Sequence, residues 1–289
     1  MSVGQAVRVS SSEEFQPQAG VVRETGLRYL SAGGGEPVVL LHGWGGYKEM
    51  WWGVMRVLSP SRRVVAFEWP GHGGSAPLES GEPVLETLAD LTAASCEALG
   101  LERIALVGHS FGGNVAARLA LDRPGLVARL ALIDAAIDAR YISRTGRLCV
   151  HPRFGSHVLR LNRLLSWPLA RLGESVSPEH EGGFLRPLAR RQSYMARVEV
   201  QALLSFLTAL YEGSLGDRVS GISQPTLVLT GERDPLVHPQ QARELAEKIP
   251  DARLCVIPRA YHCPMDERPA LFNRALLDFL RDGPRPSAE

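Results

Sequence analysis

The sequence predicts an α/β protein, and two patterns in it carry that prediction. Short apolar runs of the length of buried strands alternate with helix-compatible segments over most of the 289 residues. The alternation stops between Asp134 and about Leu215, where Arg, Leu and Ser are frequent and Pro168 and Gly173 interrupt helix-like pieces. A stretch of that length is too long for a structureless loop. We therefore expect one α/β unit with a helical insertion between two of its strands.

The first half of the chain supplies most of the expected strands. Apolar runs predict strands at 21–30, 37–41, 63–67, 104–107 and 126–133, with a glycine turn at 32–35 between the first two. Between them, apolar side chains at helical spacing predict helices around 50–55, 85–99 and 114–121. In the second of these, Leu85, Leu88 and Leu91 recur on one face, so this helix is expected to pack on the sheet.

The second half repeats the alternation after the insertion. Helix-like pieces lie at 158–172 and 195–210 inside the insertion, strands are expected at 226–229 and 253–257, and helices at 240–248 and 268–280. Apolar residues of the insertion, including Trp167 and Phe206, are expected to pack against the core. No internal repeat is evident.

Charge and composition narrow the classes of partner. The chain is 45% hydrophobic, enough for one large core plus an insertion, and its 32 basic residues nearly balance 31 acidic ones. Nucleic acid and anionic membrane surfaces call for a basic stripe, so we expect neither as a partner and expect a small-molecule substrate instead. The basic cluster Arg186–Arg191 is interpreted as a solvated helix face. The sequence indicates no oligomeric state.

The four cysteines give no sign of a metal or of disulfides. Cys96, Cys149, Cys255 and Cys263 show neither C-x-x-C nor His/Cys ligand spacing, so free thiols in a reducing compartment are expected. The first ten residues lack the apolar core of a signal peptide, and no later run is long enough to span a bilayer. These observations predict a cytoplasmic location, with no metal and no organic cofactor.

Ser110 is the predicted nucleophile. It stands at the centre of Gly108-His109-Ser110-Phe111-Gly112, between an expected strand and an expected helix. So sharp a reversal needs glycines two before and two after the serine, because a Cβ at either position would collide with neighbouring backbone.

A base and an acid follow in the order Ser, Asp, His. Asp234 comes after the strand at 226–229, and His262 follows the strand at 253–257. A serine hydroxyl needs a base, and the base needs a group that fixes its tautomer, so we predict His262 as base and Asp234 as acid. Asp134, at the end of the strand 126–133, is the alternative acid.

These motifs together resemble the α/β-hydrolase superfamily, in particular its small serine esterases with a helical cap. They are Leu41-His42-Gly43-Trp44-Gly45-Gly46, Pro70-Gly71-His72-Gly73-Gly74-Ser75, the serine turn, Gly231-Glu232-Arg233-Asp234 and Tyr261-His262. The resemblance implies an α/β-hydrolase fold: a mostly parallel central sheet with helices on both faces, reactive residues at the strands' carboxyl ends and an inserted helical cap. It also implies core parts at 1–135 and 216–289 and a cap at 136–215. Glu68 stands where the family usually has aspartate, and altered loop packing is expected there.

The loop after the strand 37–41 is the expected oxyanion hole and part of the substrate site. In similar proteins, one backbone N–H comes from the residue after His-Gly and one from the residue after the nucleophile, here Trp44 and Phe111. Tyr47 and Met50, close after this loop, are predicted to contact substrate, together with His42 and Gly43. For His42 a second base is the alternative, and a role in holding the loop by hydrogen bonds is favoured because His262 already occupies the position of the base.

The residues and the resemblance together predict a serine hydrolase that acts through an acyl-enzyme. The expected substrates are carboxylic esters with small to medium, largely apolar acyl groups. A carbon–carbon bond, a thioester or a lactone cleaved by the same triad is the alternative reaction. A non-catalytic ligand receptor on the same fold is the alternative from another class.

Overall fold

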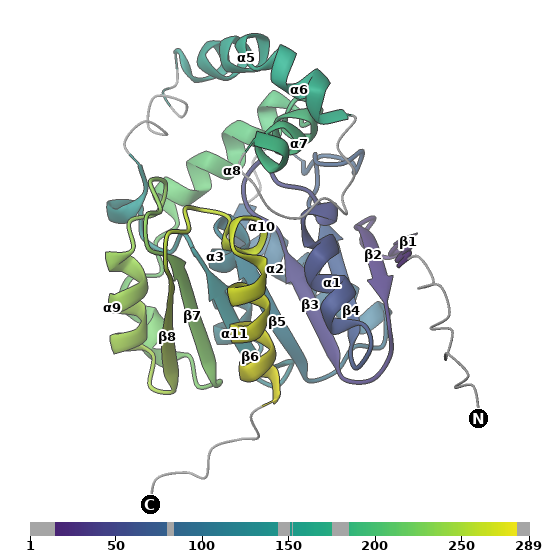
Figure 1. The fold of residues 1–289 in the computed structure, drawn as a ribbon, viewed down its shortest axis with the longest axis vertical. Coiled ribbons are helices and arrows are strands. Elements are labelled where there is room, and N and C mark those ends of the chain that lie inside the picture. Colours follow the sequence, from purple (N-terminus) through teal and green to yellow (C-terminus); the bar gives the residue numbers. More distant parts are fainter. Residues whose placement is uncertain (1–14, 80–83, 144–150, 152, 175–184, 282–289) are drawn as a thin grey trace, which may run out of the picture.

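The computed structural model describes residues 15–79, 84–143, 151, 153–174 and 185–281. Eight strands form one sheet in the order β1-β2-β4-β3-β5-β6-β7-β8 (Figure 1). The strands are β1 Gln18–Val21, β2 Arg28–Ala32, β3 Pro37–Leu41, β4 Arg63–Glu68, β5 Ile104–His109, β6 Val127–Ile133, β7 Thr226–Gly231 and β8 Ala252–Ile257. From β4 to β8 neighbouring strands are parallel, whereas β1 and β2 run antiparallel to their neighbours. The α/β-hydrolase fold expected from the sequence, with its mostly parallel sheet, is therefore confirmed.

One expected strand, at 21–30, is in fact a hairpin. The chain reverses after β1, with the Gly26 N–H donating to Val22 O (2.8 Å) and the Val22 N–H to Leu27 O (2.9 Å). Gly26 has a φ of 72°, in the left-handed region that glycine reaches without steric cost. The apolar residues that suggested one continuous strand are the buried side chains of this turn.

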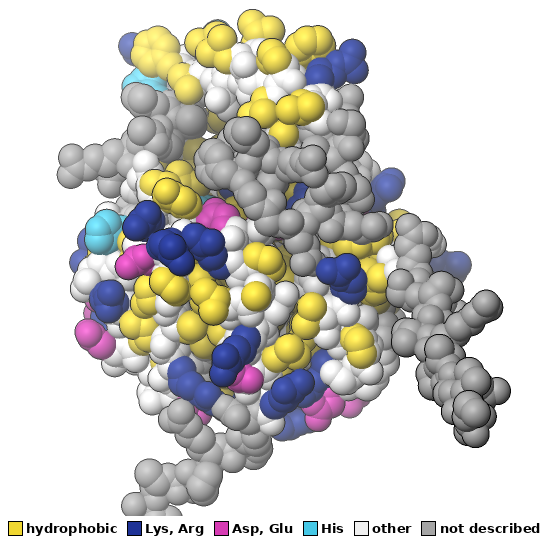
Figure 2. Space-filling view, in the orientation of Figure 1, with side chains coloured by type: hydrophobic (Ala, Val, Ile, Leu, Met, Phe, Trp, Pro, Cys, Tyr) yellow, Lys and Arg dark blue, Asp and Glu magenta, His cyan; other side chains and the backbone are white. Residues whose placement is uncertain are grey.

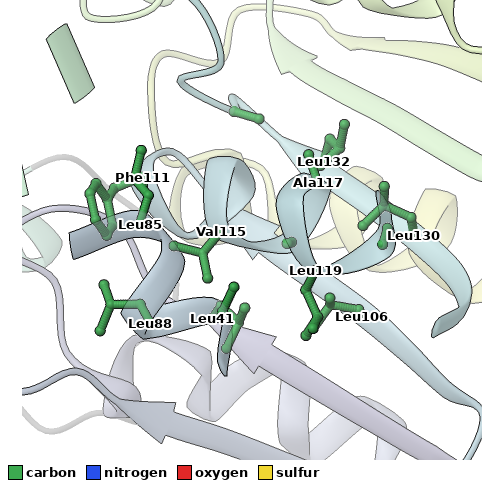
Figure 3. Packing of buried hydrophobic residues seen from close by; sticks show 14 of the residues in the cluster. Leu41, Leu85, Leu88, Leu106, Phe111, Val115, Ala117, Leu119, Leu130 and Leu132 are labelled. Carbon is green, nitrogen blue, oxygen red and sulfur yellow. The ribbon is translucent and has the colours of Figure 1, made fainter. Parts of the chain in front are cut away.

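Helices cover both faces of the sheet (Figure 1). They are η1 Lys48–Trp51, α1 Trp52–Leu58, α2 Val84–Ala98, α3 Phe111–Asp122, η2 Ala139–Tyr141, α5 Gly155–Leu165, α6 Trp167–Glu174, α7 Leu185–Met195, α8 Val200–Glu212, η3 Gly216–Gly221, α9 Gln240–Lys248, α10 Pro264–Glu267 and α11 Pro269–Arg281. The core on one face includes side chains of α2, α3, α8 and α9, and the core on the other includes those of α1 and α11. Figure 3 shows residues of α2 and α3 packed with residues of β3, β5 and β6 in the first of these cores.

Alternation along the strands explains the two cores. In β3, Val39 and Leu41 belong to the core with α2 and α3, while Val38 and Leu40 belong to the opposite one. Successive side chains of a strand point to opposite faces, so a parallel strand covered on both sides is apolar throughout. This is why β3 and β5 appear in the sequence as unbroken apolar runs.

Helices α5–α8 lie over the edge of the sheet at which the parallel strands end (Figure 1). Helix α7 contains the basic cluster that was interpreted as a helix face, and the helix expected at 195–210 begins at Val200. Phe206 packs in the core as expected, but Trp167 is 55% exposed. Figure 2 shows hydrophobic side chains gathered over these helices at the top of the view. None of the helices in the described residues has the length and apolar character of a bilayer-spanning segment.

Candidate active site

Ser110 occupies a strained turn between β5 and α3. Its φ of 53° and ψ of −116° lie where residues with a Cβ are rarely found. A Cβ on Gly108 would lie 2.4 Å from Gly112 O, and one on Gly112 would lie 2.5 Å from His42 O. Both glycines of the turn are thus required by close backbone contacts, as the sequence predicted. The chain holds the Ser110 side chain at the carboxyl end of β5, where it borders a cavity.

His262 and Asp234 meet beside this turn although 28 residues separate them. His262 Nδ1 lies 2.7 Å from Asp234 Oδ2, and a carboxylate oxygen only accepts, so Nδ1 carries the proton. The other oxygen, Oδ1, accepts the backbone N–H groups of Leu236 (2.7 Å) and Val237 (3.1 Å). Burial raises the pKa of Asp234, but the hydrogen bond and charge of His262 and these two N–H groups outweigh it. The net pKa lies below the ordinary value, so Asp234 is ionised at neutral pH.

Ser110 and His262 border the same cavity, of about 450 Å³, without a hydrogen bond between them in the described residues. The structure thus joins His262 to Asp234 and brings Ser110 and His262 to the wall of one cavity. Catalytic hydrogen bonds are often long or unmade in the absence of substrate.

Asp134 lies close to both Asp234 and His262 but has a different environment from that of Asp234. Its Oδ1 accepts from Thr230 Oγ1 (2.9 Å) and from the Gly231 N–H (2.9 Å), and it makes no hydrogen bond to His262 within the described part of the chain. Burial first, and then the nearby charge of Asp234, raise the pKa of Asp134 well above its ordinary value. A neutral Asp134 cannot stabilise an imidazolium as a carboxylate does, so the geometry favours Asp234 as acid.

His109 completes a buried group with Asp134 and His262, whose potential ligand atoms lie within 4.8 Å of one another. His109 Nε2 donates to His262 O at 2.7 Å, and burial lowers the pKa of His109 to about 3, so its ring is neutral. His262 Nδ1 and Asp134 Oδ1 are also engaged in hydrogen bonds. We place no metal here, because these contacts support the loop that carries His262.

The loop after β3, which carries Trp44, lies against the serine turn, where α3 begins at Phe111. Gly43 approaches Ser110 so closely that a Cβ on Gly43 would lie 2.9 Å from the serine Cβ. The N–H groups of Trp44 and Phe111 have no acceptor in the described part of the chain. The Trp44 indole donates to Leu203 O of α8 at 2.7 Å, which ties this loop to the inserted helices.

His42 is fully buried and does not line the cavity, contrary to its inclusion among the predicted substrate contacts. Its Nδ1 forms a hydrogen bond with Gly43 O at 2.9 Å, and its Nε2 accepts one from the Trp69 N–H. The same Nε2 atom lies 3.0 Å from Glu68 Oε1. Lys48 Nζ in turn lies 2.9 Å from Glu68 Oε2. Burial raises the pKa of Glu68, but His42 and Lys48 outweigh it and hold the pKa below its ordinary value. The buried contacts among His42, Glu68 and Lys48 thus hold the loop after β3 in place.

Gly43, Tyr47 and Met50 line the cavity, where the sequence predicted contacts to substrate. The Tyr47 ring stacks on Tyr194 of α7 with centroids 3.8 Å apart, and its hydroxyl accepts from Arg190 Nε at 3.0 Å. Burial raises the pKa of Tyr47, so the phenol is neutral at physiological pH. Much of the remaining wall is aliphatic and comes from α5 and α8, including Val158, Leu159, Leu207 and Leu210.

The basic cluster at 186–191 is not a solvated face throughout. Arg190 is 3% exposed and Arg191 lines the cavity. The sequence-based interpretation was wrong for this pair because it weighed charge alone. The apolar and aromatic residues Ala189, Tyr194 and Met195 around the pair were the available signal that one side of this helix is covered.

Three cysteines are free thiols in the described residues, and Cys149 lies outside them. Cys263 borders the cavity beside His262. Burial raises the pKa of this thiol to about 12, so it is neutral and a poor nucleophile.

Comparisons with known proteins agree with the architecture. The model of a family described as the α/β hydrolase fold matches residues 36–269. Pimeloyl-[acyl-carrier protein] methyl ester esterase of Nitrosospira multiformis is 28% identical over 276 residues, 89% of this chain and 99% of that enzyme. (E)-2-((N-methylformamido)methylene)succinate hydrolase of Acinetobacter baylyi is 27% identical over 260 residues, 89% of this chain and 94% of that enzyme. The enol-lactonase from Burkholderia xenovorans LB400 superposes with a TM-score of 0.73 at 25% identity, covering 92% of this chain and 100% of that one.

Proposed function

This chain belongs to the α/β-hydrolase family, and on that premise we propose that it is a serine hydrolase of carboxylic esters with small to medium, largely apolar acyl groups. The observation that carries the proposal is the hydrogen bond between His262 and Asp234 at the rim of the cavity that Ser110 borders. It leaves His262 Nε2 unprotonated when the ring is neutral, which is the state a general base needs. The aliphatic wall from α5 and α8 supports an apolar acyl group.

In the proposed first step, Ser110 Oγ attacks the ester carbonyl carbon while its proton passes to His262 Nε2. The carbonyl oxygen becomes an oxyanion, which accepts hydrogen bonds from the backbone N–H groups of Trp44 and Phe111. Each such donor lowers the barrier by about 3–4 kcal/mol in comparable sites. His262 then gives the proton to the alcohol oxygen, the carbon–oxygen bond breaks, and an acyl-serine remains.

In the second step, water takes the place of the alcohol. His262 accepts its proton, the hydroxide oxygen adds to the acyl carbon, and collapse of the intermediate returns the proton to Ser110 Oγ and releases the acid. We assign residues 136–215 to a cap over cores 1–135 and 216–289, because α5, α7 and α8 supply part of the cavity wall. A cap of this kind excludes water from competing hydrogen bonds at the oxyanion.

A lactone is the second candidate substrate, and the likeness to an enol-lactonase favours it over a thioester. A lactone is a cyclic ester, so the same two steps apply, with the leaving alcohol held on the acyl group. The relatives are named for several kinds of bond, so the class of bond is a matter for turnover measurements.

The test is a comparison of the native protein with Ser110→Ala, using a fluorophosphonate probe and a series of 4-nitrophenyl esters from acetate to decanoate. We expect stoichiometric labelling and turnover for the native protein, and neither for the variant, with unchanged circular dichroism. Labelling with no turnover of any ester would move the assignment to lactones, thioesters or carbon–carbon bonds. Absence of both in the native protein would support a receptor and refute the proposal.

A further inference from the structure

Two charged side chains of the cavity wall, Arg191 and Asp266, have no role in the proposed ester hydrolysis. Arg191 belongs to α7 and lines the cavity together with Ser110 and His262. Its Nη1 lies 3.3 Å from Sγ of Cys263, the residue that follows His262. A guanidinium this close to the base carries a positive charge at the reactive end of the cavity.

The side chain nearest to Arg191 does not supply an anion. A thiol is a weak acceptor, and Cys263 is neutral because burial raises its pKa to about 12. The Nε of Arg191 is buried and has no hydrogen-bond partner in the described residues. A buried guanidinium N–H without an acceptor is costly, so an acceptor from outside the chain would relieve that cost.

One carboxylate, Asp266, is shared by two arginines. It forms an ion pair with Arg190, with Nη2 and Oδ1 3.5 Å apart, and it also attracts Arg191. Arg191 and Asp266 both line the cavity, and the Asp266 carboxylate is already paired with Arg190. Arg191 is therefore the positively charged group of the cavity wall that an incoming anion can meet.

We propose that Arg191 is the anchor for a carboxylate carried by the substrate, so that the preferred esters are half-esters of dicarboxylic acids or similar anionic esters. A guanidinium presents a planar fork of N–H donors that matches the two oxygens of a carboxylate. The aliphatic wall then holds the carbon chain between the carboxylate and the ester.

This inference rests on the proposed ester hydrolysis and gives it a substrate class. A charge-assisted hydrogen bond in such a site changes affinity by about 10- to 100-fold. An anchor that contacts the free carboxylate and not the reacting carbonyl binds the ground state and transition state alike, so its loss raises KM more than it lowers kcat.

The experiment compares monoethyl esters of dicarboxylic acids, from malonate to suberate, with analogues in which a carboxamide replaces the free carboxylate. The native protein is expected to prefer the carboxylate at least tenfold in kcat/KM at one chain length. Arg191→Gln should abolish that preference, chiefly through KM, and Arg191→Lys should restore part of it. Arg160→Gln, an exposed arginine of α5 outside the cavity wall, is the matched control and should keep the native ratio.

A binding measurement separates failure of this inference from failure of the proposed function. Calorimetric titration of Ser110→Ala with the same pairs, with and without Arg191→Gln, needs no turnover. Native-like carboxylate preference in binding that is lost with Arg191 supports the anchor even if no ester is cleaved. Equal binding or turnover of carboxylate and carboxamide, or an unchanged ratio in a folded Arg191→Gln protein, would overturn the inference and leave the serine mechanism standing.

Discussion

Asp234→Asn is the substitution that most directly tests how the triad is held. In the native structure one carboxylate oxygen accepts two backbone N–H groups, from Leu236 and Val237, and the other accepts His262 Nδ1–H. An asparagine has one acceptor oxygen, and the two N–H groups of the chain require it on their side. The amide NH₂ must then face His262.

That orientation reverses the tautomer of the base. An NH₂ group donates, so His262 Nδ1 becomes the acceptor and the proton moves to Nε2, which can no longer take the serine proton. The same change in a Ser-His-Asp triad lowers kcat by about 10⁴. This corresponds to about 5.5 kcal/mol of barrier. We expect a loss of that size in pre-steady-state acylation, with little change in the thermal midpoint.

Asp134→Asn is the matched control, because the same chemical change is made at the alternative acid. The asparagine oxygen can keep the bonds from Thr230 Oγ1 and the Gly231 N–H, and an amide replaces a carboxyl that is already neutral. The loss of kcat should stay below about tenfold. If Asp134→Asn cost as much as Asp234→Asn, or Asp234→Asn kept near-native acylation, the assignment of Asp234 as the acid would be refuted.

Three further changes test the surroundings of the site. Gly112→Ala puts a Cβ 2.5 Å from His42 O, so it should lower the free energy of unfolding by about 1–3 kcal/mol and abolish labelling of Ser110 by the probe. Gly125→Ala is the control, because its Cβ would have nothing within 4 Å, and it should have neither effect. Equal effects of the two substitutions would contradict the steric argument. Burial lowers the pKa of His72 from 6.5 to about 4 in the folded state. Between these pH values the unfolded state binds a proton that the folded state does not, so the free energy of unfolding falls by about 3 kcal/mol as the pH drops from 6.5 to 4. Urea unfolding should show a shallower dependence on pH for His72→Asn, and an unchanged slope would contradict the lowered pKa. Phe206→Ala removes a ring that stacks within the core and should cost about 3–5 kcal/mol in urea unfolding, and a cost under 1 kcal/mol would show that this ring adds little to the packing.

Local features of the fold and site were predictable because they depend on short stretches of chain. The apolar run 37–41 is β3 to the residue, and Gln240–Lys248 is α9. The serine turn needs glycines at fixed offsets, and both offsets prove to be close backbone contacts. In the hairpin before β2, buried apolar residues of the turn follow a pattern typical of a strand, so the sequence predicted one continuous strand at 21–30.

Features that depend on long-range packing were not predictable in the same way. Arg191 of α7 was interpreted as solvated because its charge suggests solvent, whereas in the structure it contacts Cys263, 72 positions later, and lines the cavity. Helix propensity is a weak signal when a helix is stabilised by the core on which it lies.

By itself, the sequence determined the kinds of reactive groups, their order along the chain and the strands that carry them, since each is written in a few adjacent residues. Only the tertiary structure decided which carboxylate meets His262, that Ser110 and His262 border one cavity, and that Arg191 lines it too. Those outcomes are set by contacts between residues distant in sequence, whose energies depend on distance and burial in space and not on any local pattern.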